Sequence, residues 1–120
     1  ISQEYGRIIN ISSIWGNVSR PGRVIYSVSK AGLNGLSKSI AVEYGNKNIL
    51  ANSVSPGFTQ TELTKKTNTE KEIEEIADKI PLKRLASPNE IAKTVEFLAS
   101  ENNTYITGQN IIVDGGFTSI

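Results

Sequence analysis

Apolar and polar residues follow two different periods along the 120-residue chain. The segment from Gly6 to Ser12 is short, rich in Ile and apolar on both faces, which is typical of a strand buried on both sides. Segments Asn48–Ser55 and Asn110–Val113 have a similar apolar character and end in turn-forming residues. The pattern therefore predicts three strands.

Helical spacing of apolar residues alternates with these strands. Residues Tyr26–Tyr44 carry apolar positions near a helical period, and Gly45 supplies a stop. Two capping boxes, Thr69 with Glu72 and Ser87 with Glu90, predict helices that run up to Pro81 and through Ala99. The sequence therefore predicts an α/β fold with a parallel sheet covered on both faces.

The chain is predicted to be one folding unit over residues 1–120. No internal repeat is visible, and the only linker-like stretch is the polar segment Thr59–Thr69. Parallel sheets bind ligands beyond the carboxyl ends of their strands. The function is therefore expected at three polar turns, which are Ser12-Ser13, Ser55-Pro56-Gly57 and Asp114-Gly115-Gly116.

Charge and hydropathy exclude several classes of partner. The chain has 13 Lys plus Arg and 12 Asp plus Glu, so a net charge of +1 provides no field to attract nucleic acid or an anionic membrane. No stretch approaches the roughly 18 apolar residues of a membrane span. We expect a cytoplasmic protein whose partners are small molecules and further copies of itself.

The absence of Cys and His narrows the chemistry. Without them there is no disulfide framework, no thiolate or imidazole metal ligand and no imidazole base, so no metal site is predicted. Carboxylate, Lys and Tyr side chains remain for proton transfer.

Tyr26 and Lys30 form the candidate chemical pair, because residues four apart on a helix project from one face. An ammonium about 4 Å from a phenol favours the phenolate by roughly 4 kcal/mol at an effective dielectric of about 20, which makes the phenol a usable proton donor. The spacing alone is weak evidence, since most such pairs are solvated helix faces. Ser13 strengthens it, because its hydroxyl ends the preceding strand where it can reach the same space.

Four motifs in order resemble those of the short-chain dehydrogenase/reductases, a family that includes 3-oxoacyl-(acyl carrier protein) reductases. Together they span nearly the whole chain. The motifs are Gly6-Arg7-Ile8-Ile9-Asn10-Ile11-Ser12-Ser13, Tyr26-Ser27-Val28-Ser29-Lys30-Ala31-Gly32, Asn52-Ser53-Val54-Ser55-Pro56-Gly57-Phe58-Thr59-Gln60-Thr61 and Thr107-Gly108-Gln109-Asn110-Ile111-Ile112-Val113-Asp114-Gly115-Gly116.

The resemblance implies an NAD(P)-dependent oxidoreductase that moves a hydride between a nicotinamide cofactor and a carbonyl or secondary alcohol. In it Tyr26 would be the general acid or base, Lys30 would assist Tyr26 and bind the nicotinamide ribose, and Ser13 would donate to the carbonyl oxygen. NADP is favoured over NAD if the protein is like the acyl-carrier reductases. The substrate itself is not specified by any motif.

The resemblance also places the third motif beside the nicotinamide. Pro56 and Gly57 would pass close to the ring, since a residue without a side chain lets backbone approach a flat ring. The backbone of Thr59 and the hydroxyl of Thr61 would lie near the carboxamide. Trp15 either walls the substrate pocket or anchors a loop, and the region starting at Lys65 would cover the substrate.

The family motifs that precede these, including the Gly-rich turn that seats the pyrophosphate, are not in the chain. The chain also contains no Met, so Ile1 is not expected to be a translation start. We therefore expect the C-terminal half of a doubly wound, Rossmann-type domain, inactive by itself. Two alternatives stay open: a catalytically incomplete fragment that serves as a structural or interaction module, and a cofactor-binding regulator.

Overall fold

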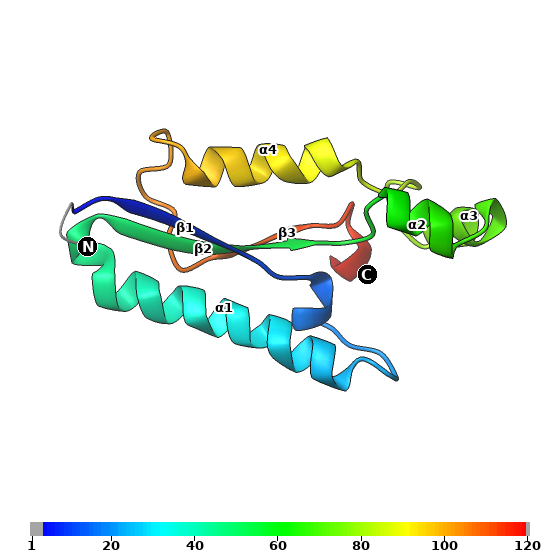
Figure 1. Ribbon diagram of the computed structural model, residues 1–120, viewed down its shortest axis with the longest axis horizontal. Coiled ribbons are helices and arrows are strands. Elements are labelled where there is room, and N and C mark those ends of the chain that lie inside the picture. The colour runs from blue at the N-terminus through cyan, green and yellow to red at the C-terminus, as the bar shows by residue number, and fades with distance from the viewer. Residues whose placement is uncertain (1–3, 120) are drawn as a thin grey trace.

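Three parallel strands lie at the centre of the molecule, with helices on both faces of the sheet (Figure 1). The structure is a computed structural model that describes residues 4–119. The strands β1 (Gly6–Ile11), β2 (Ile49–Pro56) and β3 (Asn110–Val113) are arranged in the order β1-β2-β3. This confirms the predicted α/β class and its parallel sheet.

The two long helices form the outer layers. Helix α1 (Val24–Tyr44) connects β1 to β2 and lies on one face, whereas α4 (Pro88–Ala99) lies on the other (Figure 1). The remaining elements are α2 (Glu62–Thr67), α3 (Glu70–Asp78) and the short 3-10 turns η1 (Ile14–Gly16), η2 (Gly45–Lys47) and η3 (Phe117–Ser119). Helices α2 and α3 extend beyond the carboxyl end of the sheet (Figure 1).

Strand β2 is the most buried strand, although three of its eight residues are polar. Asn52, Ser53 and Ser55 are each fully buried, and each has a hydrogen-bond partner. Asn52 Nδ2, for example, donates to Ile106 O at 2.9 Å, and Gln109 N donates to Asn52 Oδ1 at 2.9 Å. The partners offset the cost of burying these groups, so a polar strand can occupy the centre of the sheet.

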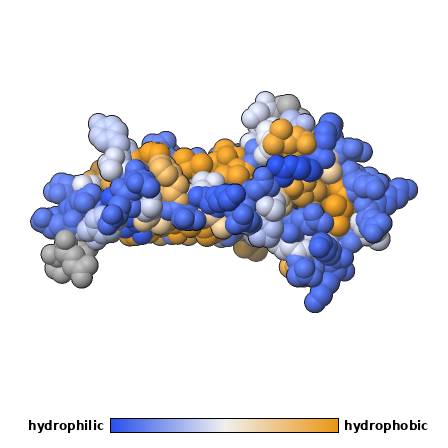
Figure 2. Space-filling model, turned by 90° about the horizontal axis from the view of Figure 1, so that it is seen from above, coloured by the Kyte–Doolittle hydropathy of each residue, from blue (hydrophilic) through white to orange (hydrophobic). Residues whose placement is uncertain are grey.

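The prediction that β1 is buried on both sides is wrong. Ile8 is 37% exposed and Ile11 is 48% exposed, because within residues 4–119 β1 pairs with β2 alone and its other edge is open. Figure 2 shows apolar surface along the middle of the molecule between more polar ends. An Ile-rich pattern indicates that a strand can be buried, but the neighbouring elements decide whether it is.

The predicted capping boxes are both formed. The hydroxyl of Thr69 accepts a hydrogen bond from Glu72 N, and Ser87 does the same for Glu90 N, while each Glu carboxylate accepts from the cap backbone. At α4 the Arg84 guanidinium also binds the Glu90 carboxylate at 2.7 and 2.8 Å. Together with the Ser87 N–H, this holds the pKa of Glu90 down to about 2.

Helix α2 was not predicted, since its residues lie in the segment Thr59–Thr69 that the sequence pattern marks as a linker. Thr61 caps α2, and its partner at the third helical position is Thr64 rather than Glu or Gln. Thr64 N donates to Thr61 Oγ1 at 3.2 Å, and Thr61 N donates to Thr64 Oγ1 at 3.3 Å. The Thr64 hydroxyl thus takes the place of the usual Glu or Gln side chain, so the sequence does not show the usual pattern of a capping box.

Within residues 4–119, no helix combines the length and apolar character needed to cross a membrane. The same part of the chain contains no group of three or more metal-ligating His, Cys, Asp or Glu side chains.

Candidate active site

The carboxyl ends of β2 and β3 approach each other closely at Gly57. Pro56 is paired with Val113, and Gly57 N donates to Val113 O at 3.0 Å. A Cβ atom on Gly57 would lie 2.7 Å from the Cβ of Asp114, which is closer than real contacts allow. The fold itself therefore requires glycine here, in addition to the approach to a flat ring that the family resemblance implies.

Ser13 follows β1 and begins η1. The residue is only 7% exposed, and its Oγ accepts a hydrogen bond from Trp15 N at 3.2 Å. Because a hydroxyl is both donor and acceptor, the Ser13 hydrogen can still be donated to a substrate. The cap thus fixes the position of Ser13 while its donor capacity is retained.

Tyr26 and Lys30 lie in the first turns of α1. The Tyr26 residue is 40% exposed, and the Lys30 Nζ lies 5.5 Å from the centroid of the Tyr26 ring. This is within the range at which an ammonium is attracted by an aromatic face. The structure therefore brings these two predicted residues together; no hydrogen bond joins the Tyr26 and Ser13 hydroxyls in residues 4–119.

Two hydrogen bonds fasten Lys30 to the end of β1. Lys30 Nζ donates to Ile11 O at 3.2 Å, and Ser12 Oγ donates to Lys30 O at 2.9 Å. In addition, Gly16 lies so close to α1 that a Cβ on it would be 3.0 Å from the Lys30 carbonyl carbon. Strand, turn and helix are thereby joined at one residue, so the position of the ammonium follows from the fold.

Thr59 and Thr61 occupy the loop after Gly57. The Thr59 hydroxyl donates to Gly57 O at 3.2 Å, and Thr59 forms a parallel bridge with Ala86. The Thr61 hydroxyl caps α2, as described above. The predicted contacts of both residues with a nicotinamide remain predictions, and the structure adds local roles for their hydroxyls.

A cavity of about 830 Å³ lies beside this site, and it is open to solvent. Elements far apart in sequence line it, among them η1, the loop after β2, α2, α3 and η3. Trp15, Phe58 and Phe117 form its aromatic wall, with ring centroids 5.2 to 6.3 Å apart in edge-to-face arrangements. Of the two roles open to Trp15, the structure supports that of a cavity wall.

Ser13, Tyr26 and Lys30 do not themselves line this cavity. Two residues that line the cavity contact the candidate catalytic residues. Trp15 N donates a hydrogen bond to Ser13 Oγ, and the guanidinium carbon of Arg23 lies 5.9 Å from the centroid of the Tyr26 ring. Arg23 and Arg20 both line the cavity, and the sequence pattern did not single out either of them. An Arg in a turn carries no signal of its own; only its tertiary neighbours show what it faces.

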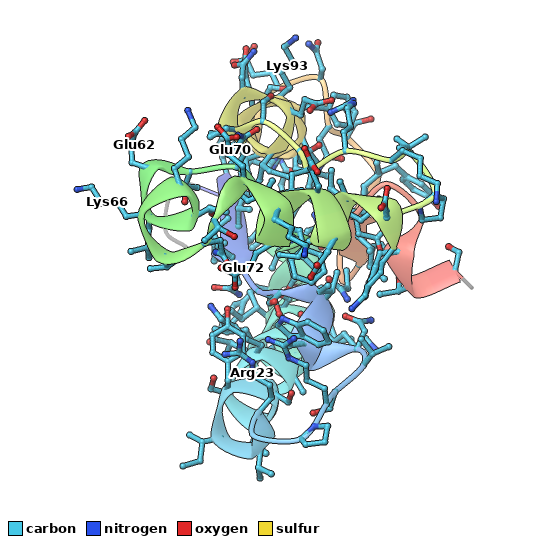
Figure 3. All side chains as sticks on the ribbon, turned by 90° about the vertical axis from the view of Figure 1, so that its right-hand side faces the viewer. Arg23, Glu62, Lys66, Glu70, Glu72 and Lys93 are labelled. Atoms are coloured by element: carbon cyan, nitrogen blue, oxygen red, sulfur yellow. The ribbon has the colours of Figure 1, made fainter. Side chains whose placement is uncertain are left out.

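Figure 3 views the end of the molecule where these elements meet. Arg23 is labelled at the start of α1, and Glu72 is labelled on α3. The carboxylate of Glu72 accepts the hydrogen bond from Thr69 N in the capping box. The Glu72 carboxylate therefore caps the start of its own helix, α3.

Asp114 holds the turn after β3. Burial disfavours its charged form, but hydrogen bonds from Thr118 Oγ1 at 2.7 Å, Thr118 N at 2.9 Å and Gly116 N at 3.0 Å outweigh burial and lower the pKa of Asp114 below its ordinary value. These bonds explain the motif Asp-Gly-Gly as a strand-ending turn. The turn also places Phe117 in the cavity wall.

Comparison with known proteins identifies the family. A family model described as enoyl-(acyl carrier protein) reductase matches residues 1–118. The chain is 48% identical over its full 120 residues to a 3-oxoacyl-[acyl-carrier-protein] reductase of Rickettsia prowazekii, and it covers 49% of that protein. It is 47% identical over 116 residues, 97% of the chain, to the enzyme of the same name from Aquifex aeolicus, of which it covers 46%.

Solved structures share the same fold. A gluconate 5-dehydrogenase from Burkholderia cenocepacia, in complex with NADP and tartrate, matches with a TM-score of 0.91 and 29% identity over 99% of this chain and 47% of that one. The protein ElxO with NADP bound matches with a TM-score of 0.88 and 37% identity over 94% and 46%. The chain thus spans about half the length of the curated relatives it matches. Its place in the C-terminal half stays a prediction from the order of its motifs.

Proposed function

The chain belongs to the short-chain dehydrogenase/reductase family, and from this premise we propose that it supplies the proton-transfer site of an enzyme that reduces a ketone to a secondary alcohol. The observation that supports this most strongly is the half-exposed Tyr26 phenol beside the Lys30 ammonium, next to the end of β1. Ser13 adds a fixed hydroxyl at the same strand end.

We propose a 3-oxoacyl thioester on a carrier protein as the substrate and NADPH as the reductant. The curated relatives at about 48% identity carry the corresponding name, and the solved relatives described above contain NADP. The donor set fits a nicotinamide nucleotide, because the Lys30 ammonium has three N–H groups and only one is used for Ile11 O. The other two can be donated to ribose hydroxyls.

The proposed mechanism is a proton transfer matched to a hydride transfer. When bound, the reduced nicotinamide supplies the hydride that the carbonyl carbon receives. The Tyr26 hydroxyl gives its proton to the carbonyl oxygen, while the Ser13 hydroxyl donates a hydrogen bond to the same oxygen. The Lys30 ammonium stabilises the phenolate left on Tyr26. In the direction of oxidation, the same phenolate accepts the alcohol proton.

A second candidate is a structural or interaction module of a longer or split reductase. The half-exposed Ile8 and Ile11 on the open edge of β1 favour it, since an unpaired apolar strand is a template for pairing with another chain. A non-catalytic regulator is disfavoured, because it has no evident use for Ser13, Tyr26 and Lys30 together. Homo-oligomeric assembly and a cytoplasmic location stay predictions.

The substitution Tyr26→Phe tests the catalytic proposal in the enzyme that carries this chain. We expect kcat to fall by about 10² to 10⁴-fold with the affinity for NADPH unchanged, because only the transferred proton is lost. Tyr105→Phe is the matched control, since Tyr105 is 96% exposed and distant in role. Rates of the Tyr26 variant within about threefold of the parent would contradict the assignment.

A further inference from the structure

The cavity beside the site is lined by positive charge without negative charge. Its lining includes Arg20, Arg23 and Lys79 and no Asp or Glu. Within residues 4–119, the ion pairs are Lys47 with Glu4 and Arg84 with Glu90, so none of the three cavity cations is paired there. A pocket of this kind attracts anions and disfavours cations.

Each of the two arginines lies near the face of an aromatic ring. The Arg20 guanidinium carbon lies 5.0 Å from the centroid of the Trp15 ring, and that of Arg23 lies 5.9 Å from the centroid of the Tyr26 ring. Neither guanidinium donates a hydrogen bond to any group in the described part of the chain. At these distances the ring face attracts each guanidinium charge, while the N–H donors stay available for a ligand.

We propose that Arg23, assisted by Arg20, forms an anion-binding subsite that selects ketone substrates carrying a carboxylate or phosphate group. Arg23 is both a lining residue of the cavity and the neighbour of Tyr26. A substrate whose carbonyl oxygen is at the Tyr26 hydroxyl can therefore present an anionic oxygen to Arg23 from the cavity. The planar guanidinium suits this role, because it can donate two parallel hydrogen bonds to one carboxylate or phosphate.

The subsite rests on the proposed function for its substrate, but binding and turnover test the two separately. Calorimetry in the presence of NADP+ measures binding without reduction. In each of two ligand pairs, one member carries an anionic group that the other lacks. The pairs are 5-oxohexanoate with its methyl ester, and the 3-oxobutanoyl thioester of 4′-phosphopantetheine with that of pantetheine. The first pair reports on a carboxylate of a small oxo acid, and the second on the phosphate of a carrier arm.

We expect the enzyme to bind the anionic member of at least one pair about tenfold more tightly than the neutral member, as for a charge-assisted hydrogen bond at a partly exposed site. Arg23→Gln should abolish this preference and leave the affinity for the neutral member unchanged. Arg23→Lys should retain part of it, since the charge is kept. Lys93→Gln, on the exposed surface of α4 and outside the cavity, is the matched control.

Equal binding of both members in both pairs would overturn the subsite, as would a preference that survives Arg23→Gln. The affinity for the neutral member shows that a variant is folded, and Arg20→Gln provides a second, exposed position if Arg23→Gln does not fold. Reduction of the neutral ketones by NADPH is measured separately. Its absence would sink the proposed function while a charge preference in binding would still support the subsite.

Discussion

Two regions border the cavity, and they are held in different ways. At the carboxyl ends of the strands, hydrogen bonds join residues far apart in sequence, as from Lys30 Nζ to Ile11 O and from Gly57 N to Val113 O. In the segment 61–79, which forms α2 and α3, the hydrogen bonds described join residues close in sequence, as in the capping boxes of Thr61 and Thr69. The first region is fixed by the whole fold, and the second by its own turns.

This difference suits the work proposed for each region. Proton transfer requires Ser13, Tyr26 and Lys30 to be held within tenths of an ångström, and contacts to several elements provide that. A segment that covers a substrate must open with little loss of stability, which locally bonded helices permit. Substitutions at the strand ends should therefore have large effects that reach the whole protein, whereas those in α2 and α3 should have small and local ones.

Among the substitutions that compare the two regions, the largest effect is expected for Lys30→Met in the enzyme that carries this chain. We expect kcat to fall about 10²-fold, because the charge beside Tyr26 and the bond to Ile11 O are both lost. Steady-state rates and thermal unfolding are measured together, with Lys38→Met on the exposed part of α1 as the control. A variant with a normal kcat would show that the ammonium takes no part in the reaction.

The next effect concerns the close approach between β2 and β3. Gly57→Ala should lower the free energy of unfolding by about 1 to 3 kcal/mol, because its Cβ collides with Asp114. Gly35→Ala in α1, where the added carbon meets no atom within 4 Å beyond its chain neighbours and the backbone of its own helix, should instead raise it by about 0.5 to 1 kcal/mol. Urea unfolding compares the two. Equal effects would mean that the strand ends are no more tightly packed than the helix surface.

A smaller loss is expected for Asp114→Asn, which weakens the bonds to Thr118 and Gly116 by about 1.5 kcal/mol in total. Folding lowers the pKa of the Asp114 carboxyl below its ordinary value of 3.8. The ionised carboxylate therefore stabilises the folded protein fully at pH values above 3.8, and this stabilisation is lost as the pH falls through the lowered pKa. Unfolding is measured against pH. The difference in the free energy of unfolding between parent and variant should shrink as the pH is lowered. A difference that does not change with pH would exclude the charge of Asp114 as its cause.

The smallest effect is expected for Thr69→Ala, which removes the cap of α3. Hydrogen exchange should show the amides of α3 opening more easily by about 0.5 to 1 kcal/mol, while those of β2 keep their protection. Thr104→Ala, at an exposed position outside any helix or strand, is the control. Faster exchange in β2 would show that the opening of α3 is coupled to the opening of the sheet, which would contradict the difference between the two regions.

Local patterns determined much of the fold. The three strands, the helix that carries Tyr26 and Lys30, and both Glu-containing capping boxes were predictable, because periodicity and capping depend on residues within one or two turns. The same holds for Tyr26 beside Lys30, since helix geometry alone sets that spacing. Helix α2 was missed because Thr64 performs the task usually given to Glu or Gln.

Contacts between distant segments were decided only by the tertiary structure. The exposure of Ile8 and Ile11 depends on which elements flank β1, and the need for Gly57 depends on Asp114 in another strand. The cavity that gathers Arg20 and Arg23 beside aromatic rings arises from loops and helices brought together by the sheet. Residues within a few positions of each other determine the local backbone conformation. The surroundings of a side chain are set by residues tens of positions away, because charge and packing act between groups that are close in space.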